Sequence, residues 1–362
     1  VFYARKLQGD IFKTAPAAWI CGDLHLENFG AYKGNNRLVY FDANDFDEAV
    51  LAPASWDVVR FLTSLLTAAE RLEISATKAA RLCQAFIESY AATLALGLIG
   101  WLEREATQGL IRNMLDELRD SKRVGLLDQH TERKGHNRRI RCDGKHALAA
   151  SDAERERVIA LVGTYAAKQA NPDFFKVDDV ANRVAGTGSL GLERFIVLVR
   201  GKGSPDGHYL LDLKQAVPSS LLPHLAIKQP DWRSEADRIV SLQRRLQAVS
   251  IAFLDPVRQG RRSYLLRGLQ ASVERVSLAP TRRDFDDIRQ VMEDMGRLVA
   301  WAQLRSAGRQ GSATADDLIA FGAAGRKWRG QMLAAATSCA VQVTHDWQTY
   351  QAAYDAGDFA DR

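Results

Sequence analysis

Hydrophobic residues recur every three or four positions along several long stretches of the chain, which is the spacing of one face of an α-helix. The longest of these stretches run from Trp56 to about Ala106 and from Phe285 to Leu304. Ser75 divides the first stretch, and its hydroxyl is placed to cap a second helix there. A further helix is predicted from Ala153 to Ala167, and the alanine-rich C-terminal segment is predicted to be helical as well.

Short apolar runs bounded by turn residues predict strands in the rest of the chain. One pair of runs, 29–32 and 37–41, is separated by a Gly-Asn-Asn turn and predicts a β-hairpin. The other predicted strands are 17–20, 194–200, 208–214, 250–258 and 262–269. The segment 120–146 is rich in Lys and Arg and is predicted to be a solvated loop. Together these elements predict an α+β fold.

Polar residues with candidate chemistry lie at both ends of the predicted hairpin. Asp23 and Asn28 precede it beside Gly22, and Asp42 and Asp45 follow it. Because the two ends of a hairpin are neighbours, we expect Asn28 to lie close to the Asp42/Asp45 cluster. Phosphoryl transfer needs a carboxylate that accepts the hydroxyl proton, and an Asn with an Asp to hold Mg²⁺ against the phosphates. The hairpin is therefore the first candidate site.

The same segments resemble a known family. The run C-G-D-L-H-L-E-N at 21–28 resembles the H-G-D-x-H-x-x-N signature of the aminoglycoside phosphotransferase and choline kinase type, with Cys21 in place of the first His. The run from Asp45 to Asp57 is similar to the D-F-G-D-A…P-A-Y-D run of that family. The resemblance implies that Asp23 is the catalytic base, that Asn28 and Asp45 bind Mg²⁺, and that Asp57 supports the loop.

Asp42 is the alternative to Asp45 for the metal. It lies 14 residues after Asn28 (42 − 28), which is nearer the usual kinase spacing than the 17 residues (45 − 28) of Asp45. Asp45 is preferred because the match from there to Asp57 needs no gap. Both carboxylates remain candidates from the sequence.

A glycine-rich run, V-A-G-T-G-S-L-G at 184–191, indicates a second part of the site. A dinucleotide-binding fingerprint opens into a helix, whereas here a strand-like run at 194–200 follows, and a second such run ends at Lys214. A glycine loop between strands, with a lysine on the next strand, is how kinases hold ATP. Glu235, 21 residues after Lys214 (235 − 214), is the candidate partner of the lysine. The predicted nucleotide-binding residues are Gly186, Thr187, Gly188, Ser189, Gly191, Lys214 and Glu235.

These parts occur in permuted order, because the catalytic and metal loops precede the glycine loop. That order, with the runs W-D-V-V-R-F and V-A-G-T-G-S-L-G, resembles the bacterial domain-of-unknown-function family 2252. The resemblance implies a kinase-like, two-lobed α+β fold with circularly permuted motifs. We expect a small, sheet-containing lobe at 176–275 and a large, mostly helical lobe formed by 1–175 and 276–362.

The composition bears on the class of protein, on the charge of its ligand and on its location in the cell. Of 362 residues 46% are hydrophobic and 26% charged, which is ordinary for a globular protein. The net charge of +5 suits an anionic ligand such as a nucleotide and gives no clear sign of a nucleic acid partner. Four scattered cysteines without C-x-x-C spacing argue against a zinc ribbon or a disulfide framework and indicate the cytoplasm. No apolar run reaches the roughly 18 residues of a membrane span, so no membrane partner is expected.

The sequence therefore predicts an ATP- and Mg²⁺-dependent phosphotransferase that acts on a hydroxyl of an unknown acceptor, either a small molecule or a protein. The small molecule is preferred, and the basic segment 120–146 would suit an anionic one. One alternative is transfer of AMP from a nucleotide bound in the reverse direction, which AMP on the acceptor would reveal. Another is a nucleotide-binding pseudokinase without activity. The presence of Asp23, Asn28, Asp45 and Lys214 argues against this last alternative.

Overall fold

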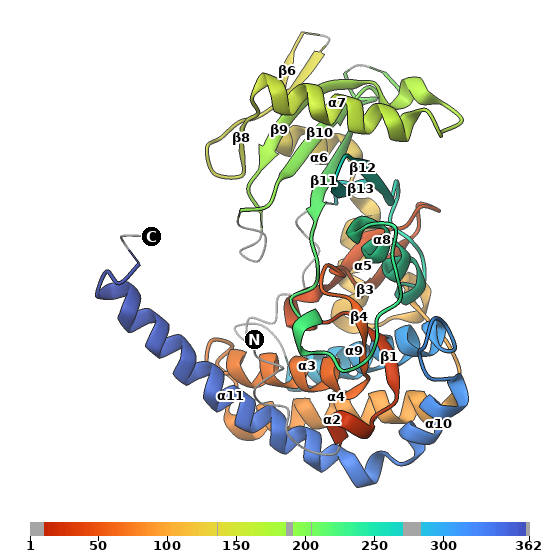
Figure 1. Cartoon of the computed structure of the whole chain (residues 1–362), viewed down its shortest axis with the longest axis vertical. Coiled ribbons are helices and arrows are strands. Elements are labelled where there is room, and N and C mark those ends of the chain that lie inside the picture. The colour runs from red at the N-terminus through yellow and green to blue at the C-terminus, as the bar shows by residue number, and fades with distance from the viewer. Residues whose placement is uncertain (1–10, 136, 186–190, 204, 271–283, 360–362) are drawn as a thin grey trace.

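The computed structural model describes residues 11–135, 137–185, 191–203, 205–270 and 284–359 (Figure 1). The chain forms a helical body and a unit built on a six-stranded sheet, which lie at opposite ends of the view in Figure 1. The body draws on both ends of the chain, and the sheet unit lies between them in the sequence. An α+β fold is therefore confirmed.

The body consists of helices around two small sheets. Its helices are α2 (Ile11–Thr14), α3 (Ser55–Ala68), α4 (Ala76–Leu96), α5 (Gly109–Asp120), α9 (Phe285–Ser306), α10 (Ala315–Ala323) and α11 (Gly325–Asp355). Strand β1 (Ala17–Ile20) pairs with β4 (Val50–Pro53), and β3 (Val39–Ala43) pairs with both β2 (Phe29–Lys33) and β5 (Leu102–Glu103). Short 3-10 helices in the chain are η1 (Leu26–Asn28), η2 (Arg104–Ala106), η3 (Pro172–Phe175) and η5 (Leu222–His224).

Helices α4 and α9 pack closely in the core of the body. Gly296 allows this contact, because a Cβ at that position would lie 2.4 Å from the backbone oxygen of Phe86. The ring of Phe86 stacks on Phe61 of α3 with 4.0 Å between the centroids. Segments from both ends of the sequence thus share one core, which also receives the apolar face of α8 (Glu235–Leu246).

The sheet of the second unit is antiparallel, with the strand order β12-β13-β11-β10-β9-β8. Its strands are β8 (Ala147–Ala149), β9 (Val177–Arg183), β10 (Arg194–Val199), β11 (Tyr209–Ala216), β12 (Asp255–Gln259) and β13 (Arg262–Gly268). The unit also contains α6 (Arg123–His130), α7 (Asp152–Ala166) and the hairpin β6 (Thr131–Lys134) with β7 (Asn137–Ile140).

Alternating residues of the sheet strands face two different cores. Phe195 and Leu213 point to the face that packs on α7. Ile196 and Leu210, on the other face, pack with Leu127 of α6. This second face continues into charged residues toward the body, and there it contributes to the candidate site.

Most predicted elements are confirmed within a few residues, but the loop predicted at 120–146 is wrong. That segment contains α6 and the β6–β7 hairpin. Arg138 explains the error: its side chain is fully buried and pairs with Asp128 and Asp206 at 2.7 and 2.8 Å. A pattern that counts arginine as exposed cannot find a strand with such a residue inside. The sheet also extends beyond the predicted lobe at 176–275, because β8 belongs to it and α7 covers it.

Two predictions from the sequence concern membrane-spanning segments and cysteines. Among the residues described, no helix is both long and apolar enough to span a bilayer. No disulfide joins the four cysteines, all of which the structure describes, and Cys21, Cys83 and Cys339 are buried. The absence of disulfides among them agrees with the sequence, while the cytoplasmic location stays a prediction.

Candidate functional site

The loop that carries Asp23 follows directly after β1 and depends on a glycine. Gly22 has φ +84°, and a Cβ there would lie 2.2 Å from the backbone oxygen of Glu48. The carboxylate of Asp57, at the start of α3, accepts hydrogen bonds from the backbone N–H groups of Cys21 (2.7 Å) and Gly22 (3.0 Å). The predicted support of this loop by Asp57 is therefore present. Burial raises the pKa of Asp57 to about 7 although these two bonds oppose the shift.

Asp23 itself lies at the surface of the body. Its side chain is 51% exposed, and Arg60 of α3 donates to its Oδ1 from Nε and Nη2, each at 2.9 Å. The imidazole of His25 lies 3.9 Å from the other oxygen. Burial lowers the pKa of His25, although the Asp23 carboxylate acts in the opposite direction. Arg60 thus fixes the orientation of the Asp23 carboxylate while the carboxylate stays accessible. Such a group suits a role in accepting a proton from a substrate.

The hairpin brings the predicted metal ligands together. Strands β2 and β3 pair Phe29 with Ala43, and the N–H of Asn44 donates to the backbone oxygen of Asn28 at 2.8 Å. The side chain of Asn28 is buried, and its Nδ2 donates to the backbone oxygen of Asp23 at 2.7 Å. This bond orients the amide so that Oδ1 is the atom that it could offer to a cation. The predicted neighbourhood of Asn28 and the acidic cluster is confirmed.

Asp42 and Asp45 differ in their surroundings. Asp42 is buried, and its carboxylate accepts from the N–H of Ala43 (2.8 Å) and of Ala248 (3.2 Å), with Arg305 at 3.7 Å. Burial raises the pKa of Asp42, and Arg305 only partly opposes this. Asp45 is exposed, and its Oδ1 accepts from the N–H of Asp47 at 3.3 Å. Asp42 is therefore occupied by internal contacts, and this favours Asp45 as the metal ligand.

The hairpin offers oxygen atoms of the kind that a Mg²⁺ ion needs. Mg²⁺ prefers oxygen ligands and often takes one or two protein carboxylates together with phosphate oxygens and water. Asn28 and Asp45 supply an amide oxygen and a carboxylate, which fit this pattern. Within the described ranges, no group of three or more His, Cys, Asp or Glu side chains forms a metal cage. Asn28 and Asp45 are therefore the residues of the hairpin that could hold a Mg²⁺ ion.

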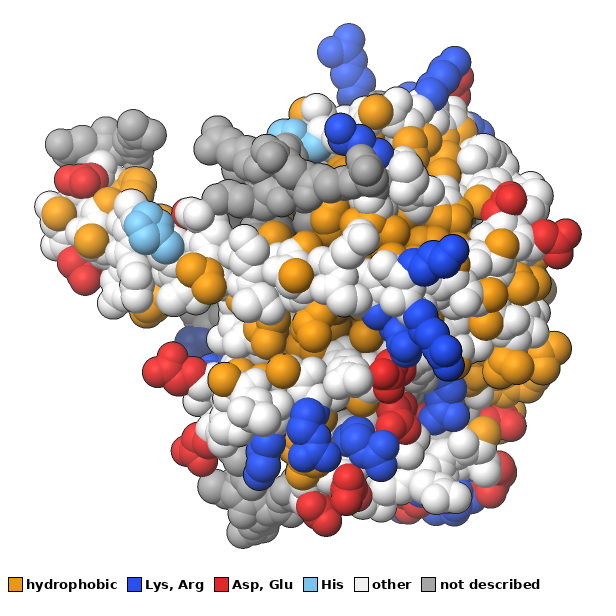
Figure 2. Space-filling view, turned by 90° about the horizontal axis from the view of Figure 1, so that it is seen from below, with side chains coloured by type: hydrophobic (Ala, Val, Ile, Leu, Met, Phe, Trp, Pro, Cys, Tyr) orange, Lys and Arg blue, Asp and Glu red, His pale blue; other side chains and the backbone are white. Residues whose placement is uncertain are grey.

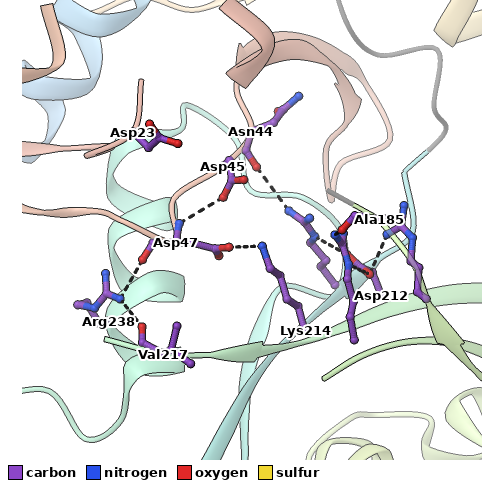
Figure 3. Close-up of polar contacts among 12 residues, drawn as sticks. Asp23, Asn44, Asp45, Asp47, Ala185, Asp212, Lys214, Val217 and Arg238 are labelled. Carbon is purple, nitrogen blue, oxygen red and sulfur yellow. Dashed lines mark hydrogen bonds and ion pairs between the residues drawn. The ribbon is translucent and has the colours of Figure 1, made fainter. Parts of the chain in front are cut away.

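Lys214 of β11 faces the loop that carries Asp45 and Asp47, called the acidic loop below, across the junction between sheet and body. Its ammonium forms an ion pair with the carboxylate of Asp47, and the lysine is only 7% exposed (Figure 3). Burial, followed by the charge of Asp45, raises the pKa of Asp47, whereas Lys214 lowers it. The structure therefore joins the predicted lysine to the acidic loop. Asp47 was missed in the sequence, although it lies in the same D-F-D run as Asp45.

Glu235 does not contact Lys214 as its spacing suggested. It begins α8 and pairs with Arg238 at 2.7 Å. Arg238 is buried and donates to three backbone oxygens, those of Ala49 (2.6 Å), Asp47 (2.9 Å) and Val217 (3.0 Å). Glu235 thus acts on the acidic loop through Arg238, a residue that sequence reasoning also missed. Its position three residues after Glu235, on the same helix face, was the available signal.

The predicted glycine loop lies mostly outside the described residues. Gly186, Thr187, Gly188 and Ser189 belong to the undescribed range 186–190, so their roles stay predictions. Gly191 is described, has φ +85° and lies three residues before β10. Strands β9 and β10, which flank this segment, are antiparallel neighbours in the sheet.

Comparison with known proteins gives a family. No curated protein and no solved structure matches the chain. A family model described as "Uncharacterized protein conserved in bacteria (DUF2252)" matches residues 1–353. The matched range includes the loops that carry Asp23 and Asp45 and the strand that carries Lys214. The chain therefore belongs to the bacterial family DUF2252.

Proposed function

We propose that this protein is a phosphotransferase of kinase-like fold that uses ATP and Mg²⁺ and phosphorylates a hydroxyl of a small acceptor molecule. The observation that carries the proposal is the junction of Asp23, Asn28 and Asp45 on the body with Lys214 on the sheet. These residues supply a proton acceptor, two oxygen ligands and a cation for phosphates. The kinase-like fold is supported by the order of β9, β10, Lys214 on β11 and α8 in the sheet unit.

In this mechanism the acceptor hydroxyl binds beside Asp23. The carboxylate takes the hydroxyl proton while the acceptor oxygen forms a bond to the terminal phosphorus, and the bond from that phosphorus to the oxygen of ADP breaks. Arg60 orients the Asp23 carboxylate through two contacts with its Oδ1. Lys214 holds the phosphates, and it must exchange its pairing with Asp47 for them. Asn28 and Asp45 would hold a Mg²⁺ ion, which would neutralise charge on the phosphate oxygens.

The test is a calorimetric titration of ATP, with and without Mg²⁺, on the wild type and on Asp45→Asn and Asp42→Asn. We expect binding that depends on Mg²⁺ and that Asp45→Asn weakens at least tenfold. The Asp42 variant is the matched control and should retain the Mg²⁺ dependence, because its carboxylate contacts Ala248 and Arg305 instead. ATP binding without any effect of Mg²⁺ or of Asp45 would contradict the metal site.

Asp23→Asn tests the chemical step separately. This variant should bind Mg²⁺–ATP as the wild type does, because Asp23 is not a ligand of the metal or of the phosphates. Its transfer or slow hydrolysis of ATP should fall by a factor of about 100 or more, the contribution of a general base. Unchanged turnover in Asp23→Asn would overturn the mechanism.

A further inference from the structure

A buried carboxylate surrounded by arginines lies beside Lys214. Asp212, two residues earlier on β11, is 1% exposed. Arg183 of β9 contacts its Oδ1 at 2.8 Å, Arg194 of β10 contacts both oxygens at 2.9 and 2.8 Å, and Arg267 of β13 contacts Oδ2 at 3.2 Å. Three strands thus each direct one guanidinium to the same carboxylate.

Positive charge exceeds negative charge in this cluster. Burial alone would raise the pKa of Asp212, but the three arginines hold it well below its usual range, so the carboxylate is ionised. Lys214 lies on the same face of β11, since side chains alternate along a strand, and it pairs with Asp47. The charge of Asp45 also acts on Arg194 and on Asp47. Four cations therefore meet three carboxylates, and one positive charge has no partner among them.

The arginines also have more hydrogen-bond donors than Asp212 can use. Each guanidinium has five N–H donors, whereas a carboxylate has about four acceptor sites. The side chains of Arg183, Arg194 and Arg267 are 22%, 11% and 18% exposed, so part of each is accessible to solvent. Crowded, partly buried guanidiniums are costly unless an anion balances them. The planar fork of arginine binds carboxylates and phosphates in a bidentate manner, and phosphate brings the larger negative charge.

We propose that Arg183, Arg194 and Arg267, held in place by Asp212, bind a phosphate or pyrophosphate group next to Lys214. Figure 3 shows Lys214 and Asp212 on the opposite side of Asp45 from Asp23. The bound group therefore lies at the end of the site away from the proton acceptor. The inference rests on the proposed function only in that Lys214 also contacts the nucleotide.

Two sources could supply this group. In the first, the group is the terminal pyrophosphate of ATP, so the α-phosphorus lies nearer to Asp23. The acceptor oxygen then bonds to that phosphorus, the bond to the β-phosphate oxygen breaks, Asp23 takes the proton, and pyrophosphate leaves from the arginines. In the second, the group belongs to a separate phosphorylated ligand that binds together with ATP, and phosphoryl transfer proceeds as proposed above.

The first experiment is a calorimetric titration of inorganic pyrophosphate without Mg²⁺. We expect the wild type to bind it and both Arg267→Met and Arg183→Met to bind it at least tenfold more weakly. Arg262→Met is the matched control: Arg262 is on the same strand as Arg267, faces the other side of the sheet and pairs with Glu193 at 2.9 Å. This variant should bind as the wild type does.

Arg267→Lys controls for misfolding of the Met variants, because lysine keeps the positive charge and lacks only the planar guanidinium. An intermediate affinity is expected, with an unchanged thermal transition. Absence of pyrophosphate binding in the wild type, or equal binding by the Arg267 and Arg262 variants, would overturn the arginine site. Neither result bears on the proposed function, which depends on Mg²⁺–ATP binding to the wild type.

A second titration identifies the source of the phosphate. Competition between pyrophosphate and Mg²⁺–ATP would support the site and assign it to the nucleotide, and AMP on an acceptor, in place of phosphate, would show that the terminal pyrophosphate occupies it. Simultaneous binding of both would support the site and assign it to a separate phosphorylated ligand. In either case Arg267→Met should weaken the affinity for the ligand assigned to the site. An unchanged affinity would overturn the assignment to these arginines.

Discussion

At the scale of single residues, Asp57 has the clearest effect on the candidate site. It lies beneath the loop that carries Asp23 and holds two consecutive backbone N–H groups of that loop. The carboxylate is completely enclosed, and its pKa of about 7 is far above the ordinary value of 3.8. The position of Asp23 therefore depends on a group that titrates close to neutral pH.

This pKa predicts how stability depends on pH. Between about pH 4 and 7 the unfolded chain has lost the Asp57 proton while the folded chain retains it, so the free energy of unfolding decreases as pH rises. The contribution is up to about 1.4 kcal/mol per pH unit. Urea denaturation from pH 4.5 to 7.5 should show this slope in the wild type and a flatter one in Asp57→Asn.

The control for this series is Asp355→Asn, which changes an exposed carboxylate at the end of α11. It should keep the slope of the wild type. If Asp57→Asn also keeps that slope, the carboxylate does not titrate in the assigned range.

At the scale of elements, α8 connects the sheet to the acidic loop of the body. Arg238 is 3% exposed, and its guanidinium joins three backbone oxygens from two segments, while Glu235 balances its charge. The helix thus determines where residues 47–49 lie relative to Val217, which follows β11. Movement of α8 would move the carboxylate that pairs with Lys214.

Arg238→Gln should therefore destabilise the protein and weaken nucleotide binding together. Loss of the buried guanidinium leaves Glu235 and several carbonyl oxygens without partners, at a cost of about 3 kcal/mol. Arg233→Gln is the control, because Arg233 is largely exposed and pairs with Asp237 near the same helix start. It should cost less than about 0.5 kcal/mol. Chemical denaturation and Mg²⁺–ATP titration of both variants measure the two effects. Equal stability of the two variants would contradict the role of Arg238.

Some elements and contacts could be predicted from the sequence, and others could not. Local signals were sufficient for the β2–β3 hairpin and for the cap of α4, where the Ser75 hydroxyl accepts from the N–H of Lys78. The hairpin in turn placed Asn28 beside the acidic cluster. Contacts over long sequence distance were not predictable: Asp47 and Lys214 are 167 positions apart. Which carboxylate meets that lysine depends on how α8 packs, and spacing alone pointed to Glu235.

At the scale of the whole molecule, α11 is only partly integrated. Its first half is anchored by Trp328, Met332, Ala336 and Cys339, all buried. Its second half extends from the body as an arm, visible at the left of Figures 1 and 2. Large side chains on this arm are exposed, with values of 43–70% for Val341, Trp347, Tyr350, Tyr354 and Phe359. The arm therefore contributes little to the core.

A protein that ends after Ala340 should remain folded. Because no residue beyond Cys339 in α11 is buried, the thermal midpoint should change by no more than about 2 °C. Trp328→Ala is the matched anchor variant and should cost about 3 kcal/mol, since the ring is buried and stacks on Phe321 at 4.6 Å. A calorimetric scan of both proteins measures this. A large loss of stability in the truncated protein would show that the arm packs against the body in solution.

The divided body has a consequence for synthesis on the ribosome. Helix α4 is made early, but α9, which packs against it, is made only after the whole sheet unit has been synthesised. The nascent chain therefore carries the apolar face of α4 without its cover while more than half of the residues are added. The interior of the sheet unit, between α7 and the strands, is complete before α9 emerges. A chain interrupted at residue 270 would thus contain a sheet unit with a complete interior and body helices whose apolar faces are exposed. Such a chain is a natural substrate for a chaperone.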